Sequence, residues 1–233
     1  YDSRYLNQLI KYQRILNQRN KFLKSRQAGQ SSASDTIDIY NMQLHEAAAE
    51  IYKTRKNFTR DILPLFEHYH NFIAGDREKV KLSYSSQLHK KELCELLRDN
   101  FEKDRILQYT YYGIHRDDLN LYINNFKINK AGSQGQQKTF LIALKLAQYD
   151  FIKRLSGKNP ILLLDDIFDK FDAQRVKKII QLIKENNFGQ IFITDTNTTR
   201  IENILADTDS QYKLFEVKEN TVNEIREKKS HEA

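Results

Sequence analysis

The segment that decides the fold is Ile161-Leu-Leu-Leu-Asp165-Asp166-Ile-Phe-Asp169-Lys-Phe-Asp172. Its aliphatic run is typical of a parallel strand covered on both faces, and two adjacent acids end it. Because parallel strands deliver the residues that follow them to one edge of the sheet, we expect Asp165 and Asp166 at a ligand-binding edge. Paired carboxylates there suit the chemistry of a magnesium nucleotide. The alternative is that the two acids only cap the following turn.

Regular elements surround this segment on both sides. The spacing of apolar residues after position 76 predicts strands at 80–84, 108–113, 119–126 and 190–194, and helices at 88–101, 134–155, 173–185 and near Ile201. A strand-helix-strand alternation around a continuous aliphatic strand predicts an α/β domain. The charged tail from Glu219 onward is expected to fray.

The first 76 residues have a different pattern. Apolar residues recur at the helical period over residues 5–23 and again over residues 37–62, where a second long helix is weakened or bent by Pro64. Small polar residues at 27–35 predict a turn between the two helices, with Asp35 able to cap the second. Neither helix can bury its apolar stripe alone, so we expect them to pack antiparallel. The predicted domains are a helical arm, residues 1–76, and a head, residues 77–233.

Composition excludes several classes of protein. With 39% hydrophobic and 30% charged residues among 233, the chain has enough apolar matter for a core, which excludes wholesale disorder. The single cysteine, Cys94, excludes an intrachain disulfide framework. The longest aliphatic run is far shorter than the roughly 20 residues of a membrane span, so we expect a soluble protein without a membrane partner. A first residue Tyr1 without a secretory signal favours a piece of a longer protein.

Positive charge is concentrated at the start of the chain. The first 26 residues carry seven basic residues and one acid, and so hold most of the formal net charge of +7. Concentrated charge on one helix is expected of a contact with a nucleic-acid backbone, with Arg14, Arg19, Lys21 and Lys24 as the candidates. The alternative is a solvated helix face whose acidic partners come from elsewhere in the fold.

The segment Gly132-Ser133-Gln134-Gly135-Gln136-Gln137-Lys138 begins the long predicted helix at 134–155. Ser133 and Gln136 have the spacing of a capping box, which is a structural interpretation. The functional interpretation is an anion site, because a serine hydroxyl, a glycine and the unpaired amides of a helix N-terminus together suit a phosphate.

Together these motifs resemble the head of ABC-type ATPases and, more closely, the RecF family of bacterial recombination mediators, which are relatives of the SMC heads. The matching segments are the family's Gly-Pro-His-Arg-Asp-Asp motif at 113–118, its signature at 133–137, its Walker B strand at 162–166, its D-loop at 168–172 and the start of its helical arm at 12–24. The resemblance runs through essentially the whole chain. It implies the C-terminal part of an ABC/SMC-type P-loop ATPase head, an α/β fold, with an arm of two antiparallel helices.

The resemblance also implies a role for each matching residue. Asp165 is expected to hold Mg2+, and Asp166 is expected to be the catalytic carboxylate. Asp172 is expected at the seam of a dimer. The residues expected to bind ATP held by another protomer are Ser133, Gln134, Gly135 and Gln136, with Ser133 and Gly135 at the γ-phosphate.

The chain departs from the family pattern at three points. Ile114 replaces a proline, and Asp195 stands where many ABC heads place a histidine. No Gly-x-x-x-x-Gly-Lys-Ser/Thr loop is present, so the main cradle of the β- and γ-phosphates is missing. We therefore expect the C-terminal portion of a RecF-like protein, without its Walker A lobe and unable to hydrolyse ATP alone.

For the whole protein, the resemblance implies a weak DNA-dependent ATPase in the cytoplasm, associated with the nucleoid. It implies an ATP-gated homodimeric clamp on duplex DNA and gap junctions that acts in gap repair with RecR and RecO and in the loading of RecA.

Two other function classes stay open. One is a magnesium-dependent nuclease or Toprim-like domain that uses Asp165, Asp166 and Asp169, and the other is an adaptor without nucleotide contact. His68 and His70 have no acids or cysteines at ligand spacing, which favours a helix surface over a metal site.

Overall fold

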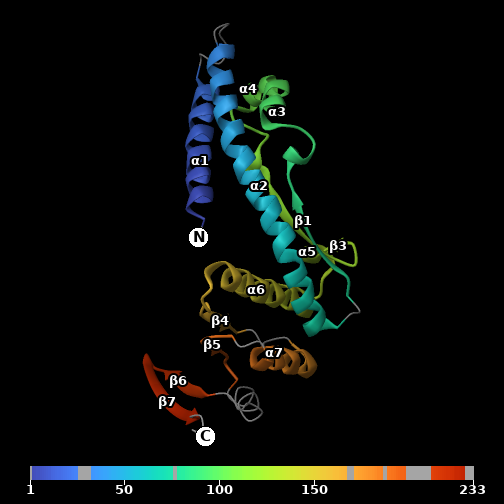
Figure 1. Cartoon of the computed structure of the whole chain (residues 1–233), viewed down its shortest axis with the longest axis vertical. Helices are drawn as coiled ribbons and strands as arrows, with labels where there is room; N and C mark the ends of the chain where they lie inside the picture. Colours follow the sequence, from blue (N-terminus) through green and yellow to red (C-terminus); the bar gives the residue numbers. More distant parts are fainter. Residues whose placement is uncertain are drawn as a thin grey trace. The chain divides into compact units, whose positions relative to one another are not determined.

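The computed structural model describes residues 2–25, 33–75, 78–166, 171–185, 188–197 and 211–228 (Figure 1). The chain divides into two compact units. Unit 1 comprises residues 1–64 and 80–130, and unit 2 comprises residues 65–79 and 131–233. Each unit therefore takes residues from both sides of position 76, and the division into an arm of residues 1–76 and a head of residues 77–233 stays a prediction.

Unit 1 contains two long helices, a small antiparallel sheet and several short helices. Its elements are α1 (Ser3–Lys24), α2 (Ala33–Ala74, in this unit up to Pro64), β1 (Val80–Ser85), η2 (Gln87–His89), α3 (Leu93–Asp99), α4 (Phe101–Leu107), η3 (Ile114–Arg116), β2 (Asp118–Ile123), β3 (Phe126–Lys127) and most of α5 (Ile128–Ala131). β2 is the central strand and pairs antiparallel with both β1 and β3.

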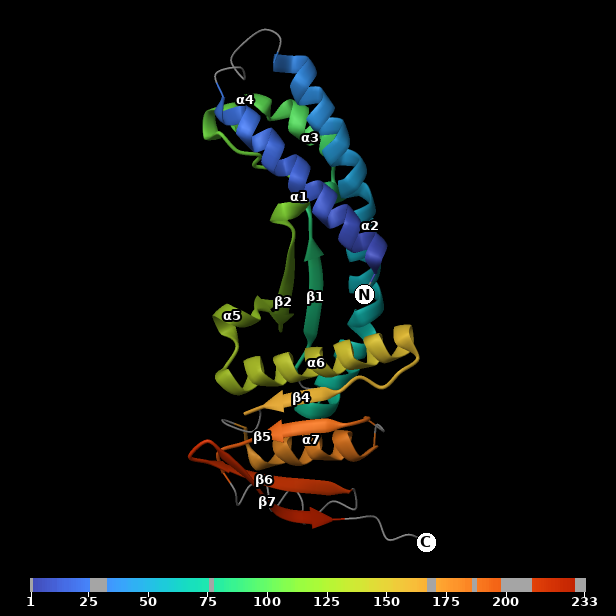
Figure 2. The same ribbon diagram turned by 90° about the vertical axis from the view of Figure 1, so that its left-hand side faces the viewer.

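The two long helices form as the apolar spacing predicted. In unit 1 they lie side by side and run in opposite directions, which Figures 1 and 2 both show. They share a buried core made by Tyr12, Ile15, Leu16, Leu44, Ala47, Ala48, Ile51, Leu93, Leu97 and Ile114. α2 continues through Pro64 to Ala74, and Asp35 lies in its first turn. Most of the turn predicted at 27–35 falls outside the described residues.

Arg19 of α1 is a buried charge in unit 1. Its side chain is 0% exposed, and Nη1 donates to Oδ2 of Asp104 at 2.7 Å and to Oγ1 of Thr110 at 2.7 Å. Nε donates to Oδ1 of Asn41 at 3.0 Å. Burial lowers the pKa of the guanidinium, and the carboxylate of Asp104, also 0% exposed, opposes that shift. The prediction that Arg19 contacts DNA is therefore wrong, because its side chain does not reach the surface.

The strand predicted at 108–113 is also wrong. The backbone amides of Thr110, Tyr111 and Gly113 donate to side chains of α1, α4 and η2, at 2.7, 2.9 and 2.9 Å respectively. A segment whose N–H groups are taken by side chains cannot also pair as a strand. The helix predicted at 88–101 is replaced by the shorter helices η2, α3 and α4.

Unit 2 has the α/β alternation that the sequence predicted. Its elements are the end of α2 from Leu65, α6 (Gln134–Ser156), β4 (Leu162–Asp165), α7 (Ala173–Glu185), β5 (Ile191–Thr194), β6 (Tyr212–Lys218) and β7 (Thr221–Lys228). β4 and β5 pair in parallel with α7 as the connection between them, and Asp165 lies opposite Thr194. The short helix predicted near Ile201 lies outside the described residues.

Only one face of β4 is covered by the described residues. Leu162 and Leu164 are buried, whereas Leu163 between them is 62% exposed. Its partner across the ladder, Phe192 of β5, is 50% exposed. Alternate residues of a strand point to opposite faces, so these two form an apolar strip on the open face. The predicted cover on the second face of β4 is therefore not present among the described residues.

Residues 212–228 form a hairpin, so the fraying predicted from Glu219 onward is wrong as far as residue 228, the last described residue. β6 and β7 pair antiparallel, and the turn between them consists of Glu219 and Asn220, with φ angles of +48° and +62°. Two consecutive residues with positive φ match the right-handed twist of a tight hairpin. The sequence signal for this hairpin was a two-residue turn between runs in which valine alternates with polar residues. The high charge of the tail obscured that signal.

Aromatic side chains join α2 to α6 in unit 2. The ring centroids of Phe66 and Phe140 lie 4.5 Å apart, and the hydroxyl of Tyr69 donates to Oδ2 of Asp150 at 2.7 Å. Burial and the Asp150 carboxylate raise the pKa of Tyr69. None of the described helices has the length and hydropathy needed to cross a membrane.

Asp104→Asn tests the buried pair in unit 1. The change leaves the Arg19 charge buried without its counter-charge, so we expect the free energy of unfolding to fall by about 3–5 kcal/mol. Urea denaturation at neutral pH measures this loss. The matched control is Glu102→Gln, which breaks the exposed pair between Glu102 and Arg105. It should cost less than about 1 kcal/mol. Equal losses in the two variants would contradict the central role of the Arg19 pair.

Candidate functional site

Several predicted site residues meet at one edge of unit 2. Figure 2 shows β4 and β5 pointing toward the side at which α6 begins. The Nζ atom of Lys138, in the second turn of α6, lies 3.5 Å from the carbonyl oxygen of Asp166, so the start of α6 and the end of β4 are neighbours. This edge is where an α/β sheet binds its ligands.

The acid pair is exposed at this edge. Asp165 is the last residue of β4, and its Oδ1 accepts a hydrogen bond from the hydroxyl of Thr194. The amide of Asp166 donates to the carbonyl oxygen of Thr194 at 3.2 Å. Asp166 has φ +44°, a left-handed conformation that costs a non-glycine residue about 1–3 kcal/mol and is found preferentially at functional sites. Residues 167–170 lie outside the described residues, which leaves the role of Asp169 and the turn-capping alternative untested.

The start of α6 forms the capping box that the spacing indicated. The Oγ atom of Ser133 accepts from the amide of Gln136 at 3.3 Å, and Oε1 of Gln136 accepts from the amide of Ser133 at 2.9 Å. Helix geometry leaves the amides of Gln134 and Gly135 without a partner inside the helix. Ser133 is exposed, and its hydroxyl proton is available to an acceptor. The capping-box interpretation is thus correct. It still leaves the hydroxyl and amide donors that the anion-site interpretation needs.

Asp172 caps α7. Its Oδ1 accepts from the amide of Arg175 at 2.9 Å, and its Oδ2 lies 3.5 Å from Nε of the same arginine. The Asp172 side chain is 61% exposed, so its local structural role does not withdraw it from the surface. Asp195 makes a comparable local contact, because its Oδ1 accepts from the amide of Asn197 at 2.7 Å.

Two residues of this edge were missed by the sequence reasoning. Thr194 holds a carboxylate oxygen of Asp165, and Lys138 reaches the backbone of Asp166. Thr194 ends the strand after β4, so parallel pairing of neighbouring strands was the signal that it lies opposite Asp165. Lys138 gave no comparable signal, because its proximity depends on how α6 packs.

The cations of α1 divide by helix face. Besides Arg19, two others are paired with acids of α2, since Arg4 lies 3.4 Å from Glu50 and Lys11 lies 3.7 Å from Glu46. The alternative of acidic partners from elsewhere in the fold is therefore correct for these three. The remaining DNA-binding candidates, Arg14, Lys21 and Lys24, are exposed and form no ion pair with the described residues.

Residues of the motif at 113–118 make structural contacts inside unit 1. Nη1 of Arg55 donates to Oδ2 of Asp117 at 2.9 Å and to the carbonyl oxygen of Ile114 at 2.7 Å. Ile114, which replaces the family's proline, belongs to the buried core of this unit. Gly113 has φ +139°, and a Cβ atom there would lie 2.5 Å from the Tyr12 hydroxyl oxygen. Only glycine fits this position.

His115 of the same motif is held as a neutral ring. Its Nε2 lies 3.0 Å from the carbonyl oxygen of Thr110, which can only accept, so Nε2 carries the proton. Nδ1 then accepts from the hydroxyl of Tyr12 at 2.9 Å. Burial is the main cause that lowers the pKa of His115.

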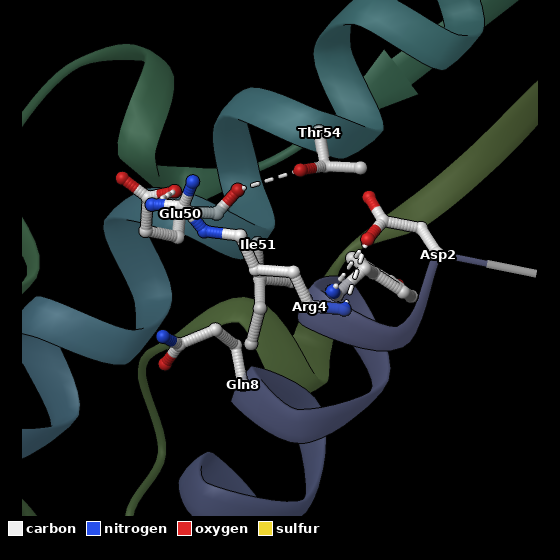
Figure 3. A pocket seen from close by; sticks show the side chains of 7 residues that line it. Asp2, Arg4, Gln8, Glu50, Ile51 and Thr54 are labelled. Atoms are coloured by element: carbon white, nitrogen blue, oxygen red, sulfur yellow. Dashed lines mark hydrogen bonds and ion pairs between the residues drawn. The ribbon is translucent and has the colours of Figure 1, made fainter.

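A shallow pocket lies between α1 and α2 in unit 1. Figure 3 shows its lining by Asp2, Arg4, Gln8, Glu50 and other residues, with the Asp2 carboxylate occupied in capping α1. Its volume is about 20 Å³, which is close to the space of one water molecule. None of the predicted site residues lines it.

Comparison with known proteins identifies the family. No family model matches the chain. The chain is 50% identical over 214 residues to the DNA replication and repair protein RecF of Flavobacterium johnsoniae, 49% identical over 225 residues to RecF of Azobacteroides pseudotrichonymphae and 43% identical over 228 residues to RecF of Bacteroides fragilis. These matches cover 92%, 97% and 98% of the chain. The chain belongs to the RecF family. It spans 60–61% of the length of these RecF relatives.

Solved structures agree on the fold. The structure described as the recombination mediator protein RecF-ATP in the RecFOR pathway superposes with a TM-score of 0.77 at 24% identity, covering 97% of this chain and 59% of that one. An Smc head bound to the C-winged helix domain of ScpA gives a TM-score of 0.50 at 15% identity, covering 89% of this chain and 52% of that one. The predicted fold class, part of an ABC/SMC-type ATPase head, is confirmed.

The individual site roles stay predictions. The part of the chain that the structure describes contains no group of three or more His, Cys, Asp or Glu residues placed to hold a metal ion. Because Asp169 is outside that part, the three-carboxylate nuclease hypothesis stays untested. The placement of His70 on a helix surface was wrong, since His70 is 0% exposed while His68 is exposed.

His115→Gln tests the neutral histidine. Because its pKa is lower in the folded state than the unfolded value of about 6.5, the unfolded state takes up the proton more readily. The stability that the neutral His115 ring contributes is present above about pH 6.5. It is lost as the pH falls from there through the lowered pKa of His115. Urea denaturation at pH 7 and pH 5 should therefore show a smaller acid-induced loss in the variant than in the parent protein. Equal acid-induced losses of stability in the variant and the parent protein would show that His115 does not titrate as inferred.

Proposed function

We propose that the chain is the C-terminal portion of a RecF-like ATPase that closes as a homodimer around Mg2+-ATP and thereby controls its grip on DNA. The observation that carries this proposal is the meeting of the exposed acid pair with the start of α6 at one edge of unit 2. Further support comes from the identity with RecF relatives and from the likeness to the RecF-ATP structure.

The residues of this edge carry the chemical groups that phosphoryl transfer requires. The hydroxyl of Ser133 and the amides of Gln134 and Gly135 are donors for the γ-phosphate of ATP held by a second protomer. Asp165 accepts a hydrogen bond from the Thr194 hydroxyl, and its carboxylate oxygens would hold Mg2+. When bound, Mg2+ neutralises charge on phosphate oxygens. Asp166 would accept a hydrogen bond from the attacking water and orient it.

The remaining hydrogen-bond donors for the phosphates of ATP must come from outside this sequence. The 233 residues contain no phosphate-loop motif, and the apolar strip of Leu163 and Phe192 is exposed on the open face of the β4–β5 sheet. We propose that a lobe carrying the phosphate loop covers this face in the full-length protein. Hydrolysis then requires both parts, and this chain alone does not turn over ATP.

Asp166→Asn and Ser133→Ala test the nucleotide site in full-length protein that carries a phosphate loop. Loss of the carboxylate that orients water should lower ATP turnover by about 100-fold or more, because positioned acid-base groups contribute about 10²–10⁴-fold. Loss of the Ser133 donor should weaken Mg2+-ATP-dependent dimerisation. Phosphate release and sedimentation velocity are the measurements.

The control for this pair is Asp150→Asn. Asp150 is a half-buried carboxylate of the same helix as Ser133, near its other end, and its contact is with Tyr69. This variant should keep turnover and dimerisation. Wild-type turnover in Asp166→Asn would exclude Asp166 as the catalytic carboxylate.

We propose that DNA contacts the exposed face of α1. Arg14, Lys21 and Lys24 recur at helical spacing, so they share one face, and they have no ion pair among the described residues. Contacts of lysine and arginine with phosphates give affinity without strong sequence preference. By family, RecR and RecO are the proposed partners, RecA is the protein loaded, and gap junctions in the cytoplasmic nucleoid are the proposed place of action.

Arg14→Ala and Lys21→Ala test this surface through the salt dependence of duplex binding. Each lost phosphate contact should reduce the slope of log K against log salt by about 0.9. Fluorescence anisotropy of a labelled duplex at several salt concentrations measures the slope. The matched control is Lys11→Ala on the same helix, whose ammonium is paired with Glu46 and whose loss should leave the slope unchanged. Unchanged slopes in all three variants would remove α1 from the DNA site.

A further inference from the structure

Glu78 is a largely buried carboxylate beside the first turn of α6. It follows the end of α2, and its side chain is only 13% exposed. Its Oε1 accepts from Nε2 of Gln136 at 3.0 Å. The other end of the Gln136 amide, Oε1, accepts from the backbone of Ser133. Glu78 is therefore two hydrogen bonds away from the residue expected at the γ-phosphate.

The same carboxylate also faces α7. Nη2 of Arg175 lies 3.5 Å from Oε1 of Glu78, and Nη1 of Arg175 donates to Oγ1 of Thr139 in α6 at 3.2 Å. The backbone and Nε of Arg175 contact the carboxylate of Asp172, the residue expected at the dimer seam. Arg175 thus joins the cap of α7 to the first two turns of α6.

The second oxygen of Glu78 points toward a buried histidine. Nε2 of His70 lies 3.6 Å from Oε2 of Glu78, and neither atom has a hydrogen-bond partner in the described residues. Burial lowers the pKa of His70, an effect that Arg175 reinforces and Glu78 opposes. With His70 neutral, Arg175 is the charged ion-pair partner of Glu78 among the described residues. Unpaired buried polar atoms cost stability, so this cluster is a poor device for stability alone.

We propose that Glu78 is a positioning residue that locks the Ser133 turn of α6 to the Asp172 cap of α7, so that both nucleotide-facing groups move as one piece. The linkage runs from Ser133 through Gln136, Glu78 and Arg175 to Asp172, and every contact in it lies within unit 2. This inference rests on the proposed ATP-dependent dimerisation. It adds a group that touches neither nucleotide nor partner and acts through the orientation of Gln136.

An exchange of the two side chains tests the linkage in the full-length protein. Gln136→Glu keeps a capping box, because glutamate is equally suited to that position, but it places two carboxylates against each other. We expect the Mg2+-ATP concentration for half-maximal dimerisation to rise about tenfold. The double variant Glu78→Gln with Gln136→Glu restores one carboxylate and one amide across the same contact. It should lower the half-maximal concentration at least about threefold below that of Gln136→Glu alone, a non-additivity expected of residues in direct contact.

Two results would overturn the proposal. One is a double variant as impaired as Gln136→Glu, which would mean that Gln136 acts by its own contact with the phosphate. The other is a Gln136→Glu protein that dimerises normally. Thermal unfolding of each variant beside Asp150→Asn separates a folding defect from a positioning defect, and Glu78→Gln alone provides a second, isosteric probe that should raise the half-maximal concentration. If Ser133→Ala also leaves dimerisation unchanged in the same assay, the proposed function fails as well; if only the Glu78 and Gln136 variants are silent, the positioning role alone fails.

Discussion

The parallel pairing of β4 with β5 is the constraint on which the candidate site depends. Parallel strands joined by a helix must both end at the same edge, and this brings Thr194 opposite Asp165 although 28 residues separate them. The same connection makes α7 begin close to that edge. Once α6 packs with its first turn nearby, acids, hydroxyl groups and free helix amides gather on one exposed margin of unit 2.

Buried charge organises both units, in different ways. In unit 1 the fully buried pair of Arg19 and Asp104 ties α1 to α4 and to the loop that follows it. In unit 2 the Glu78 carboxylate holds Gln136 and Arg175 from two different helices. A charge taken out of water demands partners with good geometry, so each of these residues restricts how the surrounding elements can pack. They give unit 1 a fixed core and give unit 2 a fixed orientation of the turn at Ser133.

The local patterns of the sequence predicted the long elements well. The bounds of α6, α7 and β4 follow closely from apolar spacing and capping residues, because helix and strand periods depend only on neighbours along the chain. The order of signature, strand and acid pair was sufficient to indicate the ATPase-head fold. The loop at 108–113 failed as a strand because side chains of distant elements take its amides, a competition that no local pattern records.

By itself, the sequence determined which helices and strands form and which chemical groups lie at their ends. Only the tertiary structure decided which charges are available to a ligand: Arg19 and Arg14 look alike along α1, yet one is sealed against Asp104 and the other faces solvent. It also decided that Leu163 is exposed and that Glu78 supports the Ser133 turn. The physical reason is that helix and strand formation is set within a few residues, whereas burial and pairing depend on segments that meet only when the chain has folded.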